Sequence, residues 1–280
     1  MKYGLYLPNF GAETSARGLA DLAQAAEEAG WDGFFLWDHV IASQTQSPPL
    51  INPWIALTAM ALATNHIRLG TTVTPVPRRL PWLLARETAA IDQLSDGRLV
   101  LGVGIGVDEE YEQFGQEMAP RQRGEKLDES LEIITGLWSG KPFSYKGKHY
   151  RVRKTTFLPP AVQSPRIPIW VGGFWPNKRP FLRAARWDGV IPLSAEGGFL
   201  MTPDQYRELL AFIRKYRPNE SPLEVVNIGN STAAGADGSK GVKKISQYTA
   251  AGVTWWLEIL YSKHNSMAKL RQRILEGPPG

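Results

Sequence analysis

Short apolar runs alternate with amphipathic helical segments along the whole chain, and this alternation limits the possible folds more than any other feature. The predicted strands cover residues 3–7, 33–37, 67–74, 99–104, 167–171, 189–192, 223–229 and 254–259. The predicted helices cover residues 15–29, 53–64, 82–94, 123–138, 176–186, 204–216, 240–251 and 265–276. Strands that are each followed by a helix close readily into a (β/α)8 barrel at this chain length. We therefore expect an α/β fold with one (β/α)8 (TIM) barrel domain over residues 1–280, with an open doubly wound sheet as the alternative.

The alternation is interrupted between the fourth and fifth predicted strands. Short aromatic segments at residues 143–145 and 149–152 flank Lys146-Gly147-Lys148, which is typical of a turn. We expect a small hairpin there, within an insertion at about residues 106–165.

The composition excludes several classes of function. The formal charge of +5 is modest and dispersed, so nucleic-acid binding is not expected, although an anionic cofactor is compatible with it. No apolar run approaches the roughly 18 residues of a membrane span, and the first residues lack the pattern of a secretory signal. The absence of cysteine fits a cytoplasmic protein, and the four dispersed histidines predict no metal site.

The second predicted strand ends abruptly at an acid and an imidazole. Residues 33–37 are apolar or glycine, as in a strand covered on both faces. Ligands bind at the carboxyl ends of parallel strands, so Asp38 and His39 stand where an active site is expected. His39 is the main catalytic candidate because imidazole can relay a proton near neutral pH, and Asp38 is better interpreted as an orienting or capping carboxylate. A purely structural histidine is the alternative.

Further candidates lie at the ends of the other predicted strands. Gly172-Gly173-Phe174 precede a predicted helix, and glycines there let backbone N–H groups approach an anion. A phosphate-bearing cofactor is therefore expected, although the chain has neither a P-loop nor a full dinucleotide fingerprint. Candidates for a substrate pocket are Asn9, Phe10, Trp37, Trp175, Trp256 and Glu258. For each of the aromatic residues among them, a place in the core is the alternative.

Several segments together carry a family resemblance that covers most of the chain. They are Ala26–Gly33, Trp37–His39, Ile67–Pro75, Leu94–Leu99, Leu101–Gly104, Pro168–Gly173 and Ala185–Gly189. Jointly they resemble the bacterial luciferase-like superfamily of flavin- and deazaflavin-dependent oxidoreductases, the luciferase-like monooxygenase family. These motifs are specific for the superfamily and poorly specific for any one reaction within it.

The resemblance implies a (β/α)8 barrel with reduced FMN or the deazaflavin coenzyme F420 at its carboxyl-terminal mouth. It implies a non-proline cis peptide at Thr72-Val73 behind the cofactor ring, and His39 beside the reacting face of that ring. The residues implied to bind the cofactor are Thr72, Val73, Gly104, Gly172, Gly173, Phe174, Leu193 and Ser194.

Two departures narrow the expected reaction. The catalytic glutamate of the family's sugar-phosphate dehydrogenases corresponds to Val107, and Glu109 or Glu110 could replace it only if the loop folds differently. The flavin-phosphate arginine of the luciferases corresponds to Gly104. Neither a sugar-phosphate dehydrogenase nor a light-emitting luciferase is therefore expected.

The predicted function is that of an oxidoreductase, either an oxygen-activating monooxygenase or a hydride-transfer enzyme, acting on a small organic molecule. The resemblance implies a homodimer, and a separate flavin or deazaflavin reductase is a possible partner. A non-catalytic barrel that carries or senses a flavin or another ligand is the alternative.

Overall fold

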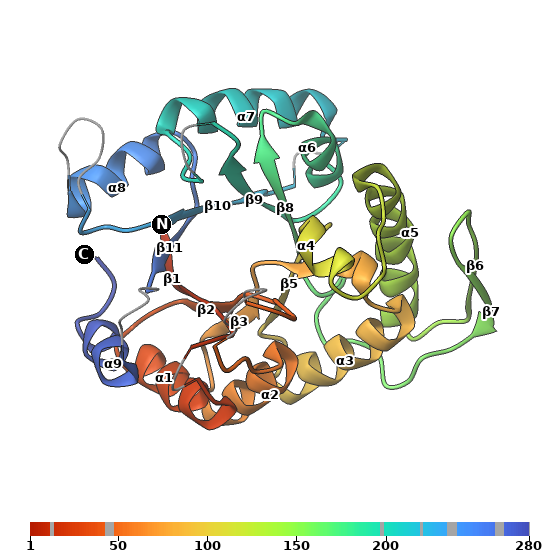
Figure 1. The fold of residues 1–280 in the computed structure, drawn as a ribbon, viewed down its shortest axis with the longest axis horizontal. Coiled ribbons are helices and arrows are strands. Elements are labelled where there is room, and N and C mark those ends of the chain that lie inside the picture. Colours follow the sequence, from red (N-terminus) through yellow and green to blue (C-terminus); the bar gives the residue numbers. More distant parts are fainter. Residues whose placement is uncertain are drawn as a thin grey trace.

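Eight parallel strands form a closed barrel in the computed structural model, which describes residues 1–11, 14–42, 48–196, 199–218, 221–233, 240–260 and 266–279 (Figure 1). The strands are β1 (Lys2–Leu7), β2 (Gly33–Leu36), β3 (Arg68–Thr71), β5 (Leu99–Gly104), β8 (Ile169–Trp175), β9 (Gly189–Ser194), β10 (Glu224–Gly229) and β11 (Trp255–Ile259). β1 pairs with both β2 and β11, and β3 pairs with β5, so the ring closes. The predicted (β/α)8 barrel is confirmed, and the open sheet is excluded.

Helices surround the barrel and cover its outer face (Figure 1). They are α1 (Ala16–Glu28), α2 (Pro53–Ala63), α3 (Pro81–Leu94), α5 (Pro120–Trp138), α6 (Lys178–Ala184), α7 (Pro203–Tyr216), α8 (Gly241–Ala250) and α9 (Met267–Leu275). Ser15 caps α1, Asn52 caps α2, and Thr202 forms a capping box with Gln205 at the start of α7. Two short helices in loops, η1 (Val76–Arg78) and α4 (Asp108–Glu112), were not predicted. No helix in the described part of the chain is long and apolar enough to cross a membrane.

The barrel interior is filled by side chains that alternate along the strands with those facing the helices. The rings of Phe35 and Trp170 stack 5.2 Å apart, and the Trp255 ring meets Trp170 edge-on at 5.3 Å. A Cβ atom at Gly70 would lie 3.1 Å from the Phe35 ring and 2.4 Å from the carbonyl oxygen of Val100, so glycine makes room for this aromatic layer.

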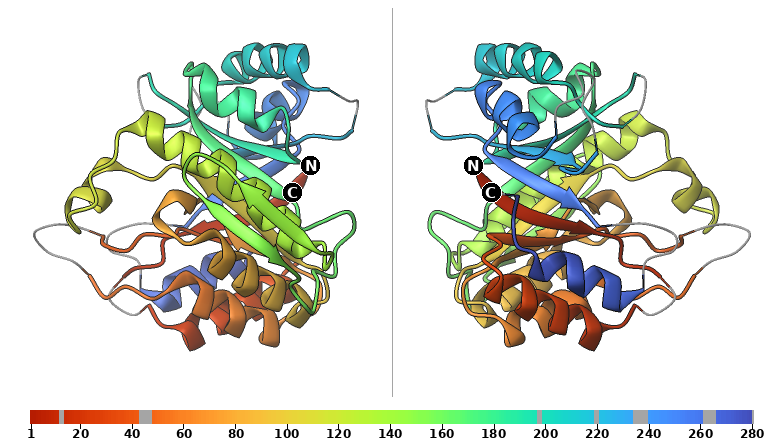
Figure 2. Two further views of the ribbon diagram at one scale, coloured as in Figure 1. Left: turned by 90° about the vertical axis from the view of Figure 1, so that its right-hand side faces the viewer. Right: turned by 90° about the vertical axis from the view of Figure 1, so that its left-hand side faces the viewer.

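The insertion between β5 and β8 contains two short antiparallel strands, β6 (Phe143–Lys146) and β7 (Arg151–Thr155). They lie outside α5, away from the barrel (Figures 1 and 2). Glu129 of α5 accepts hydrogen bonds from the backbone N–H groups of residues 148–150, which fixes the turn of the hairpin to that helix.

Candidate active site

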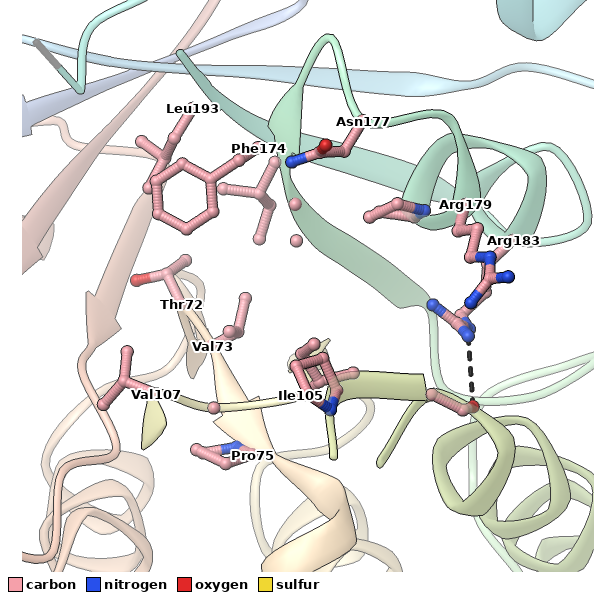
Figure 3. Close-up of a pocket in the computed structure, with 18 of the residues that line it drawn as sticks. Thr72, Val73, Pro75, Ile105, Val107, Phe174, Asn177, Arg179, Arg183 and Leu193 are labelled. Atoms are coloured by element: carbon pink, nitrogen blue, oxygen red, sulfur yellow. Dashed lines mark hydrogen bonds between the residues drawn. The ribbon is translucent and has the colours of Figure 1, made fainter. Parts of the chain in front are cut away.

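A cavity of about 1450 Å³ opens at the carboxyl ends of the barrel strands. Its floor is the upper part of the barrel interior. The side chains that line it are aliphatic apart from one phenol: Tyr6, Val73, Ile191, Leu193, Ile228 and Ile259. Figure 3 shows Val73, Leu193 and Phe174 around the apolar part of the cavity.

The Thr72-Val73 peptide bond is cis, as the family resemblance implies. It lies between β3 and the two-residue strand β4 (Thr74–Pro75), which pairs with β5. Val73 occupies space that two glycines leave open. A Cβ atom at Gly104 would lie 2.6 Å from Val73 Cγ2, and one at Gly172 would lie 2.9 Å from Val73 Cγ1. These residues, all predicted to bind a cofactor, line one wall of the cavity.

His39 lies where β2 has ended, and its main chain is fixed by Asn9. The Asn9 side chain donates to the His39 carbonyl oxygen at 2.9 Å and accepts from the His39 N–H at 3.2 Å. The His39 side chain is 34% exposed and lines the cavity, and its Nδ1 atom lies 3.0 Å from Oε1 of Glu110. The structure therefore presents the imidazole to the cavity in a defined orientation.

Glu110 is the partner that orients this imidazole. It lies on α4, is 3% exposed, and also accepts from the Val40 N–H at 2.9 Å and from the guanidinium of Arg78. Burial by itself would raise the pKa of Glu110, but the hydrogen bond from His39 and the charge of Arg78 outweigh it and lower the pKa. An ionised carboxylate only accepts hydrogen bonds, so Nδ1 of His39 carries a hydrogen, and Nε2 is the nitrogen left to exchange a proton.

Asp38 holds two arginines. It is 4% exposed and accepts from Nη2 of Arg78 at 3.0 Å, from Nη2 of Arg79 at 3.1 Å and from the indole N–H of Trp54 at 3.3 Å. Arg78 thus bridges Asp38 and Glu110. This geometry favours the orienting interpretation of Asp38 over a role as catalytic acid.

The side of the cavity near α5 and α6 carries cations. Arg183 is neutralised by Asp128, with Nε 2.6 Å from Oδ1, and it also donates to the carbonyl oxygen of Gly124 (Figure 3). Arg179 lines the same side and makes no ion pair with any residue that the structure describes. An anionic group of a ligand would therefore meet an uncompensated charge here.

Four predicted site residues on the barrel strands, Trp175, Ser194, Trp256 and Glu258, lie outside the cavity, because strand residues alternate between the interior and the helix layer. Trp175 packs against Phe181 of α6, with ring centroids 5.5 Å apart. Trp256 packs against Tyr248 of α8 at 5.4 Å, and its indole N–H donates to Glu258. Ser194 hydrogen-bonds the loop at Glu196.

Three further predicted residues are distributed around His39. Trp37 lines the cavity, with its ring 5.5 Å from the imidazole. Phe10 does not line the cavity but meets the Trp37 ring edge-on at 5.6 Å, and Asn9 is fully buried. Asn9 and Phe10 thus support the wall of the cavity without forming its surface.

Sequence reasoning missed the pairing of Glu110 with His39. The sequence shows Glu109 and Glu110 side by side and does not distinguish them, but α4 places Glu109 in solvent and turns Glu110 inward. Val107, which the family resemblance matches to the catalytic glutamate of the sugar-phosphate dehydrogenases, is 43% exposed at the rim of the cavity. Among the described residues no cluster of histidines and acids could hold a metal ion.

Comparison with known proteins identifies the family. The family model described as "Luciferase-like monooxygenase" matches residues 1–232. The chain belongs to this family. Membership confirms the resemblance that the sequence motifs carry.

The names of the relatives include both predicted classes of cofactor, a flavin and F420. The oxygenase component of a flavin-dependent trigonelline monooxygenase from Acinetobacter baylyi is 33% identical over 164 residues, 58% of this chain and 44% of the relative. An F420-dependent glucose-6-phosphate dehydrogenase from Nakamurella multipartita is 34% identical over 188 residues, 66% of this chain and 54% of the relative. The chain thus spans about half the length of these family members. The structure of an F420-dependent tetrahydromethanopterin reductase from Methanopyrus kandleri shares the fold, with a TM-score of 0.75, 16% identity and coverage of 99% of this chain and 98% of that one.

Proposed function

We propose that this protein is an oxidoreductase that binds reduced FMN or coenzyme F420 at the mouth of the barrel and oxidises or reduces a small organic molecule. One observation carries the proposal: a single cavity contains an oriented imidazole, an apolar floor and an uncompensated cation. Such a combination suits a ligand that has a flat ring system at one end and an acidic group at the other.

The residues around the cavity fit this cofactor class. Val73, held between two glycines, offers an apolar surface for a ring. Thr72 Oγ1 is buried and has no hydrogen-bond partner among the described residues, so a ligand hydrogen bond could satisfy it. Arg179 and the backbone at residues 172–174 would receive the phosphate.

The chain's own residues would then orient the reactants and handle the proton. When bound, the reduced cofactor would supply electrons to oxygen or to a carbonyl substrate, and oxidised F420 would accept a hydride from an alcohol. Nε2 of His39 would hold or accept the accompanying proton, while Glu110 fixes the ring and Asn9 fixes the main chain. Trp37 and Phe174, which line the cavity, would limit the access of water to the reacting atoms.

Anaerobic titration of the purified protein with reduced FMN and, separately, with reduced F420 tests the proposal. Binding of FMN followed by rapid consumption of readmitted oxygen supports a monooxygenase. Binding of F420 without an oxygen reaction supports hydride transfer if the reduced cofactor also turns over a carbonyl compound, or if oxidised F420, added separately, turns over an alcohol. Binding of either cofactor without any turnover would support the carrier alternative, and failure to bind both would overturn the proposal.

We also propose partners for this enzyme. An oxygenase that consumes reduced FMN needs a separate flavin reductase, in agreement with the words "oxygenase component" in the name of the Acinetobacter relative. A homodimer would form through α2 and α3. α2 contains no charged residue and exposes Ile55 and Leu62, while the adjacent helix α3 exposes Leu83, and Leu80 just before α3 is exposed as well. An apolar surface of this kind on adjacent helices is typical of a protein interface.

A further inference from the structure

The part of the cavity floor formed by β1, β9, β10 and β11 differs from the side near α6. Four aliphatic side chains and one phenol cover it: Ile191, Leu193, Ile228, Ile259 and Tyr6. Trp37 adds an aromatic wall, with its ring 5.2 Å from that of Tyr6. A ligand that rests on this part of the floor therefore makes apolar contacts almost everywhere.

The described residues of these four strands place no lysine or arginine side chain at this surface. The lysine and arginine side chains that line the cavity lie elsewhere: Arg121 belongs to α5, Lys178, Arg179 and Arg183 belong to α6, and Arg186 follows α6. A phosphate or carboxylate group placed on the isoleucines would lose its water without gaining a partner there. A neutral ligand meets no such penalty.

Tyr6 supplies the one hydroxyl group of this floor within the described part of the chain. That hydroxyl has no hydrogen-bond partner among the described residues, so it is available to a ligand. Burial raises the pKa of Tyr6, so the phenol keeps its hydrogen at neutral pH and can donate it. It can donate to any ligand oxygen, and on a surface without cations the oxygen that can be buried beside it at least cost is an uncharged one.

We infer that the substrate is a neutral, largely apolar alcohol or ketone whose oxygen accepts a hydrogen bond from Tyr6 while its body lies on the isoleucines. This inference rests on the proposed function, since it assigns the other side of the cavity to the cofactor. The substrate differs in charge from glucose 6-phosphate, which the name of the Nakamurella relative gives as that protein's substrate. Tyr6 lies on β1 and His39 follows β2, so the two polar groups approach the cavity from neighbouring strands.

Isothermal titration calorimetry on the full chain, with and without bound FMN, tests the inference. The probes are acetophenone and cyclohexanone, with glucose 6-phosphate as the charged comparison. We expect at least one ketone to bind and glucose 6-phosphate not to compete with it. Tyr6→Phe should weaken ketone binding roughly 3- to 10-fold, the effect of losing one neutral hydrogen bond, and leave FMN affinity unchanged. Tyr3→Phe is the matched control on the same strand, because Tyr3 does not line the cavity, and it should bind ketone as the wild type does.

The inference is overturned if neither ketone binds, if Tyr6→Phe binds ketone as tightly as the wild type, or if glucose 6-phosphate displaces the ketone. These results are distinct from a failure of the proposed function. If ketone binds in the expected way but the protein binds neither reduced FMN nor reduced F420, the substrate surface stands and the assignment of the cofactor fails.

Discussion

Nδ1 of His39 lies 3.0 Å from Oε1 of Glu110, although 71 positions separate the two residues in the sequence. The same carboxylate oxygen accepts the backbone N–H of Val40 at 2.9 Å, so one buried oxygen fixes both the imidazole and the chain beside it. Glu110 is therefore the residue on which the orientation of His39 depends.

Glu110→Gln is expected to lower kcat with little change in cofactor affinity. The amide keeps the size of the side chain but removes the charge that holds the hydrogen of His39 on Nδ1. We expect kcat to fall roughly 10- to 100-fold, as is typical when a partner that orients a histidine is lost. Glu109→Gln, on the exposed neighbour, is the matched control and should leave kcat unchanged. Steady-state kinetics on both variants measure this difference. Equal kcat values for Glu110→Gln and Glu109→Gln would contradict this role of Glu110.

The same carboxylate should make stability depend on pH. The pKa of Glu110 in the folded protein lies below its ordinary value of 4.5. Because folding lowers this pKa, the ionised carboxylate stabilises the folded protein fully at pH values above 4.5. This stabilisation is lost as the pH falls through the lower, folded-state pKa. The difference in the free energy of unfolding between the wild type and Glu110→Gln should therefore shrink as the pH is lowered from 7 to below 4.5. Urea unfolding across this range measures it, and a difference independent of pH would contradict the assignment.

The fold could be predicted because its information is local. Each strand is a short apolar run and each long helix has an apolar face, so the alternation of the two is visible in the sequence. The count of eight strands then favours a closed barrel over an open doubly wound sheet. The place of His39 follows from the same logic, since it directly follows a strand whose carboxyl end must face the mouth.

The partner of His39 could not be predicted, because its position depends on packing. α4 has five residues, too few for a visible periodicity, and it is held where the Tyr111 hydroxyl donates to the carbonyl oxygen of Ile105. The sequence also does not show which residues of each strand face the barrel interior and which face the helices. Trp255 and Trp256 are both apolar, so the sequence does not show that the first faces the barrel interior and the second faces α8.

Arg78→Ala should impair both stability and turnover, because Arg78 bridges two buried carboxylates. Leaving Asp38 and Glu110 without this partner should cost about 3–5 kcal/mol of stability. Added guanidinium at a concentration too low to denature the protein should restore part of kcat. Arg79→Ala is the comparison, since Arg79 contacts Asp38 and Glu87 but not Glu110, and its kcat should not respond to guanidinium. Equal rescue of both variants would argue against a specific role of Arg78.

Leu62→Glu should convert the proposed homodimer into monomers. Leu62 is 70% exposed on the uncharged face of α2, and a carboxylate there would have to be buried without a partner in the dimer. Leu158→Glu is a suitable control, because Leu158 is 64% exposed in the insertion, outside the proposed interface. Sedimentation velocity would detect the change. A wild type that is already monomeric, or a Leu62→Glu variant that remains a dimer, would rule out this interface.

Arg179→Gln should weaken cofactor binding without affecting the chemistry at His39. Arg179 lines the α6 side of the cavity and makes no ion pair within the described chain, so its charge is available to the phosphate of the cofactor. Loss of one charge-assisted hydrogen bond should raise the Kd for reduced FMN or F420 roughly 10-fold or more. The remaining affinity should depend less on salt, because fewer charges attract the anion. Arg153→Gln, on the exposed strand β7 far from the mouth, removes the same charge from the protein and should leave the Kd unchanged. If both variants bound the cofactor equally well, the anionic group would have to lie elsewhere, and the backbone at residues 172–174 would remain as its binding site.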